Sequence, residues 1–70
     1  MNIEKILQKL QCLAELNQVT FKLENMTVYV GDWCWIGSHY GNWEEFLFEA
    51  LVAAEIYYGI KNEKKYQENK

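Results

Sequence analysis

The stretch Val19–Gly37 reads V-T-F-K-L-E-N-M-T-V-Y-V-G-D-W-C-W-I-G, and it decides the fold. Apolar and polar residues alternate along most of it, and a period of two is typical of β-strands with one covered face. Two turn signals, Glu24-Asn25 and Gly31-Asp32, divide the stretch into three short strands. The sequence therefore predicts a three-stranded antiparallel meander.

The position of each turn predicts which residues face one another. A two-residue turn at Glu24-Asn25 predicts apolar pairs that share one face: Leu23 with Met26, Phe21 with Val28 and Val19 with Val30. Because Glu is a poor first turn residue, a slightly longer loop is the alternative. A Gly-X turn at Gly31-Asp32 adds Trp33 and Trp35 to the covered face. The outer face then carries a partly apolar set that we expect to be a contact surface: Thr27, Tyr29, Cys34 and Ile36.

A helix is predicted on each side of the meander. The first has Asn2 as its capping residue, ends near Leu16, and has one apolar face: Ile3, Ile6, Leu7, Leu10, Leu13 and Ala14. Asn42, followed three residues later by Glu45, signals the start of the second helix, and Gly59 signals its end.

These elements predict an α+β fold in the order α-β-β-β-α. It is a three-stranded antiparallel meander with two helices packed on one face, the face that carries Phe21, Val28 and Trp35. We expect residues 1–60 to form a single compact domain and residues 61–70 to form a charged, flexible C-terminal tail.

The second helix has no polar face. One broad stripe is predicted to be core: Trp43, Phe46, Leu47, Ala50, Leu51, Ala54, Tyr57 and Tyr58. Phe48, Val52 and Ile56 lie on roughly the opposite side, interrupted by Glu45 and Glu49 among other glutamates. A chain of 70 residues is too small to surround a helix completely. We therefore expect this second stripe to contact another chain, and we expect a homodimer.

The charge distribution bears on the kind of partner. The chain has seven Lys and no Arg, and within residues 1–60 three Lys stand against eight carboxylates, a net charge of −5. Nucleic-acid binders need clustered basic residues, so we expect no direct nucleic-acid binding. An acidic body suits a basic protein surface, such as that of a nucleic-acid enzyme. A solvated acidic surface without a partner is the alternative.

Few residues are candidates for chemistry. His39 is the single histidine, and a lone general acid or base is one interpretation, whereas a turn-supporting or partner-contacting residue is the other. Cys12 and Cys34 show no metal-ligand spacing, so we expect no metal and two free, mostly buried thiols, with a disulfide between them as the alternative. No signal peptide and no apolar run of membrane-spanning length is visible, which favours the cytoplasm and no membrane contact.

The aromatic residues allow a second hypothesis. Trp33, Trp35, Tyr40 and Trp43 are close in the predicted fold and would line a pocket for a flat ligand if they were not core. No Gly-rich phosphate loop or basic clamp accompanies them, so we expect no cofactor. Packing against the helices is the simpler interpretation.

Two resemblances concern RNA. The helix–three strands–helix order resembles the double-stranded-RNA-binding domain, which holds phosphates with lysines at the start of its second helix. Here that place reads Asn42-Trp43-Glu44-Glu45, so the resemblance implies the fold and not RNA binding. The motif Gly37-Ser38-His39 is similar to the Gly-Ser-His motif of HicA toxins, which implies RNA cleavage by His39.

Two further resemblances concern inhibitors. The segment Trp43–Tyr58, with Glu44-Glu45 and Ala53-Ala54, is similar to a helix of HicB antitoxins. The short, acidic, motif-free chain with its Lys-only basic residues also resembles small anti-CRISPR proteins of phages that infect low-GC Gram-positive bacteria. That likeness implies a phage protein acting in the host cytoplasm.

We therefore expect a non-enzymatic small protein that binds and inhibits another protein, a component of host defence or a toxin, through an acidic and aromatic surface. The residues predicted to bind partners are Phe48, Val52, Ile56, Glu45, Glu49, Tyr29, Ile36, His39 and Tyr40. A small-molecule sponge using the Trp/Tyr cluster is the alternative, followed by a lone-histidine ribonuclease.

Overall fold

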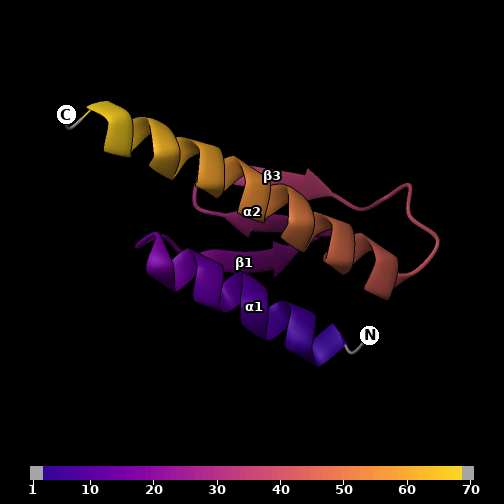
Figure 1. The fold of residues 1–70 in the computed structure, drawn as a ribbon. Helices are drawn as coiled ribbons and strands as arrows, with labels where there is room; N and C mark the ends of the chain where they lie inside the picture. The colour runs from indigo at the N-terminus through magenta and orange to yellow at the C-terminus, as the bar shows by residue number, and fades with distance from the viewer. Residues whose placement is uncertain (1–2, 69–70) are drawn as a thin grey trace.

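The computed structural model describes residues 3–68, and side chains within residues 3–61. Its elements are α1 (Ile3–Leu16), β1 (Phe21–Glu24), β2 (Thr27–Val30), β3 (Trp33–Ile36) and α2 (Trp43–Glu68). The strands form one antiparallel sheet in the order β1-β2-β3, and both helices cover the same face of it (Figure 1). The helices lie side by side and run in the same direction. The predicted α+β meander with two helices on one face is thereby confirmed.

The hairpin between β1 and β2 differs in register from the predicted one. The observed pairs are Phe21 with Val30, Lys22 with Tyr29, Leu23 with Val28 and Glu24 with Thr27. The turn residues are Asn25 and Met26, whose φ angles are 51° and 56°. The predicted turn at Glu24-Asn25 and its three apolar pairs are therefore wrong. Positive φ at both turn residues is typical of a type I′ turn, and Asn tolerates this conformation better than Glu.

The second hairpin has the predicted register. Val28 faces Trp35 and Val30 faces Trp33, so the turn lies at Gly31-Asp32 as expected. Gly31 has a φ of 64°, and a Cβ atom there would lie 2.7 Å from the hydroxyl oxygen of Tyr58. A glycine at this position therefore allows both the turn and the close approach of α2.

The end of α1 is set by backbone hydrogen bonds. Gln18 adopts a φ of 58°, in the left-handed region. The amide of Val19 donates to the carbonyl of Ala14 at 2.9 Å, and the amide of Gln18 donates to the carbonyl of Glu15 at 3.1 Å. This pair of bonds is a Schellman motif, which satisfies the last carbonyls of the helix and directs the chain toward β1. The predicted capping residue Asn2 lies outside the described residues.

The start of α2 is confirmed, but its predicted end is wrong. The amide of Glu45 donates to the side-chain oxygen of Asn42 at 2.7 Å, as the capping signal predicts. The helix then continues through Gly59 to Glu68. Gly59 lacks the positive φ of a helix-ending glycine, and the residues beyond it are mostly good helix formers. Most of the segment predicted as a tail is therefore a continuation of α2, and residues 69–70 lie outside the described part.

The core lies between the two helices and β2. Its buried apolar residues are Ile6, Leu10, Ala14, Val28, Val30, Phe46, Leu47, Ala50, Leu51, Ala54 and Tyr58. Tyr58 is 2% exposed, and its hydroxyl donates a hydrogen bond to the carbonyl of Val30. Trp43, predicted to be core, is 44% exposed because it begins α2 at the edge of the packed region. Tyr57 is half-buried. The rest of the predicted stripe is buried.

Candidate protein-binding surfaces

One face of α2 is apolar and exposed to solvent. Phe48, Val52 and Ile56 are 40%, 40% and 59% exposed, and we call these three residues the α2 strip. They lie at i, i+4 and i+8, so they form a continuous row along the helix. The opposite side of the same helix carries Ala50 and Ala54, which are fully buried. The core of the chain is therefore complete without the α2 strip.

Carboxylates flank this row on the side of α2 that is turned away from α1. At 100° per residue, Glu45 and Glu49 lie beside Val52 and Ile56, and both glutamates are exposed. Glu45 is also fixed in place by the capping bond of its own amide to Asn42. The α2 strip and its two glutamates thus form one surface, as the sequence predicts for these five residues.

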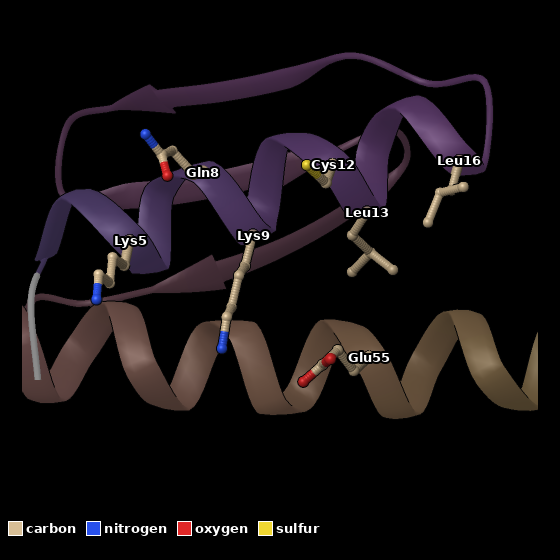
Figure 2. Close-up of a pocket in the computed structure, with 7 residues that line it drawn as sticks. All are labelled: Lys5, Gln8, Lys9, Cys12, Leu13, Leu16 and Glu55. Carbon is tan, nitrogen blue, oxygen red and sulfur yellow. The ribbon is translucent and has the colours of Figure 1, made fainter.

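A groove of about 590 Å³ runs between the two helices on the side away from the sheet (Figure 2). Its lining includes Lys5, Lys9, Cys12, Leu13 and Leu16 from α1, and Glu55 from α2. Lys9 extends across the groove toward α2, where the side chain of Glu55 points along that helix toward its N-terminal end. Leu16 is 81% exposed at the end of α1. Nothing in the sequence indicates the groove, because it depends on how the two helices pack.

The outer face of the sheet forms a second surface, on the opposite side of the molecule from the α2 strip. Tyr29 and Ile36 are exposed there, together with the free thiol of Cys34. Lys22 Nζ lies 2.6 Å from Glu24 Oε2 and 6.0 Å from the centre of the Tyr29 ring. The hydrogen bond to Glu24, and the charge of that carboxylate, raise the pKa of Lys22 above its ordinary value. This face combines apolar side chains with a neutralised ion pair.

His39 and Tyr40 have different environments in the loop before α2. The indole nitrogen of Trp35 donates to the Tyr40 hydroxyl at 3.1 Å, and the Tyr40 ring lies 5.6 Å from that of Phe46. Tyr40 therefore helps to close the core. His39 is exposed, and its ring packs on Tyr40 with 4.5 Å between ring centres.

The tryptophans of β3 act as a cover for the core. Trp33 and Trp35 stack with their ring centres 5.9 Å apart and an interplanar angle of 15°. Both are half-buried and pack against the buried cluster. This packing gives the Trp/Tyr cluster a structural role, and nothing in it favours the small-molecule hypothesis.

The predicted partner-binding residues therefore belong to three places. Five lie on the exposed face of α2, two lie on the outer face of the sheet, and His39 and Tyr40 lie in the loop that precedes α2. The exposure of Leu16 was not predicted from the sequence. Leu16 is the last residue of α1, and nothing in the neighbouring sequence indicates that its side chain is exposed.

The thiols also differ from expectation. Cys12 and Cys34 are both free, as predicted, but both are exposed, so the expectation of buried thiols is wrong. Cys12 lies beside the apolar face of α1, and its side chain lines the groove. Cys34 lies on the outer sheet face, which none of the described helices covers.

Within the described residues, no group of three or more His, Cys, Asp or Glu side chains is placed to hold a metal ion. None of the described helices combines the length and apolar character needed to cross a membrane. Comparisons of the chain with protein-family models, with curated proteins and with solved structures give no match.

Proposed function

We propose that this chain is a non-enzymatic protein that binds and inhibits another protein, and that it acts as a homodimer. The observation that carries the proposal is the α2 strip. Three large apolar side chains are exposed in a row on a helix whose other side already fills the core. Rows of this kind, with polar residues at the margins, are typical of protein interfaces.

The two exposed surfaces suit two different partners. Because the α2 strip and the outer sheet face lie on opposite sides of the molecule, a dimer formed through α2 leaves the outer sheet face of each copy free. We assign the α2 strip to a second copy of the chain. We assign the outer sheet face, with Tyr29 and Ile36, to the inhibited target.

The charge of the chain favours a basic target. The net charge of the body is −5 over residues 1–60, and complementary fields accelerate association and select partners. Nucleic-acid enzymes present such basic surfaces. The resemblances to anti-CRISPR proteins and HicB antitoxins support a target among bacterial defence proteins or toxins.

The test is capture of the target by the tagged chain from bacterial extract, including extract of phage-infected cells. We expect a stoichiometric nuclease, helicase or toxin, whose activity falls when purified chain is added. Changing Tyr29→Lys together with Ile36→Lys should abolish capture. The matched control is Gln11→Lys with Gln18→Lys, two exposed residues that do not line the groove, which should retain it. Recovery of the tagged chain alone from every extract would contradict the proposal.

A further inference from the structure

We propose a specific arrangement for the second copy: the α2 strip of each chain enters the groove between α1 and α2 of the other. Lys5 and Lys9 of one copy then meet Glu45 and Glu49 of its partner. The inference rests on the homodimer in the proposed function and adds how the two copies are oriented.

Two rows of opposite charge lie on the helical layer. Lys5 and Lys9 lie on the side of α1 that lines the groove, one helical turn apart. Glu45 and Glu49 are also one turn apart, on the side of α2 that is turned away from its own α1. Each row therefore advances about 6 Å along its helix, at 1.5 Å per residue, so the spacings of the two rows match.

Both rows of charge are also available to a second chain. Among the described residues, Lys5, Lys9, Glu45 and Glu49 form no ion pair within 4.0 Å. The glutamates cannot meet the lysines of their own chain, because the body of α2 stands between them. When α2 of a second copy lies in the groove, the glutamates of that copy lie next to Lys5 and Lys9 of the first. Unlike charges then face each other twice, once on each side of the two-fold axis.

The two rows also lie at matching levels along the helices. Because α1 and α2 run in the same direction, a two-fold axis parallel to them keeps every residue at its own level. Glu55 lies opposite the space between Lys9 and Leu13 (Figure 2). Counting back equally on both helices brings Glu49 level with Lys5. The partner's Glu49 therefore arrives opposite Lys5.

The apolar contacts agree with this arrangement. The floor of the groove contains Leu13, and its far end is bordered by Leu16, which is 81% exposed. At these levels the partner's Ile56 lies next to Leu13, and the partner's Ile60, which is 53% exposed, lies level with Leu16. Burial of both sets removes apolar surface from water in one step, which is the main driving force of association.

Charge reversal tests the arrangement. We expect Lys5→Glu and Glu49→Lys each to weaken the dimer about ten-fold, since each places two like-charge contacts across the interface. Combining Lys5→Glu with Glu49→Lys should restore the wild-type dissociation constant. Sedimentation equilibrium over a concentration series measures all four proteins. The control Glu15→Lys makes the same charge change as Glu49→Lys, but on the side of α1 that lies near β1. It should leave the dissociation constant of the dimer unchanged.

The outcomes separate this inference from the proposed function. A double variant no tighter than the weaker single variant would overturn the arrangement, while a homodimer formed in another way would stand. A wild-type chain that is monomeric at every concentration would overturn both. If the wild type is monomeric and Lys5→Glu instead reduces capture of a target, the groove binds that target and not a second copy.

Discussion

At the scale of a single residue, Tyr58 joins α2 to the sheet. Its buried hydroxyl donates to the Val30 carbonyl, and Gly31 next to Val30 leaves the space that this approach needs. Burial raises the pKa of Tyr58 above its ordinary value of 10.0, and the nearby negative charge of Asp32 raises it further. The tyrosine therefore stays neutral in the folded chain at a pH where it ionises in the unfolded chain.

This shift predicts a loss of stability in alkali. Below about pH 10 the phenol is protonated in both states, so its contribution is complete. Above that pH the unfolded chain loses the proton first, and the free energy of unfolding falls until the folded tyrosine also ionises. Urea unfolding between pH 8 and pH 11 should show this decline. Tyr58→Phe should be less stable at pH 8 by about 1 kcal/mol, for the lost hydrogen bond, and should decline less steeply. Equal slopes for the two proteins would contradict the assignment.

Gly31 should tolerate no side chain. A Cβ there would lie 2.7 Å from the Tyr58 hydroxyl and 3.0 Å from Val19 Cβ, at a φ of 64°. We expect Gly31→Ala to lower the free energy of unfolding by about 2 kcal/mol, from backbone strain and crowding together. Gly41→Ala is the control, because a Cβ at Gly41 has nothing within 4 Å. Thermal unfolding by circular dichroism measures both, and equal melting temperatures would show that the close approach costs nothing.

At the scale of the elements, local turn chemistry decided which predictions succeeded. The Gly31-Asp32 turn was predictable because glycine at the first position permits the positive φ that a tight hairpin needs. The first hairpin was not, because Met26 adopts a φ of 56°, which its side chain does not favour. The end of α2 was missed for a similar reason. Gly59 is a common stop signal, but its backbone stays helical here.

The β1–β2 hairpin therefore offers a simple stabilising change. Met26→Gly creates Asn-Gly, the pair that best fits a type I′ turn, and it removes a side chain that is already exposed. We expect the free energy of unfolding to rise by about 1 kcal/mol, and the melting temperature by about 4–8 °C. Asn25→Ala should instead lower the free energy of unfolding and the melting temperature. A lower melting temperature for Met26→Gly would mean that the Met26 side chain stabilises the fold through contacts that outweigh its strained backbone.

At the scale of the whole molecule, the chain is one layer of helices on one sheet, with an exposed surface on each side. The periodicity of the second helix was enough to predict that Phe48, Val52 and Ile56 share a face and lie outside the core. The groove beside them was beyond prediction, because it depends on the distance and relative direction of two helices that are far apart in sequence. The charges that border it, Lys5 and Lys9, look like ordinary solvated residues in the sequence alone.

The central claim is that the α2 strip is an interface, and sedimentation velocity tests it most directly. We compare the wild-type chain with the variant Phe48→Glu and Val52→Glu. The wild type should sediment as a dimer and the variant as a monomer. The two should have similar circular dichroism spectra, because neither side chain belongs to the core. A variant that remains dimeric, or a wild type that never associates, would contradict the claim.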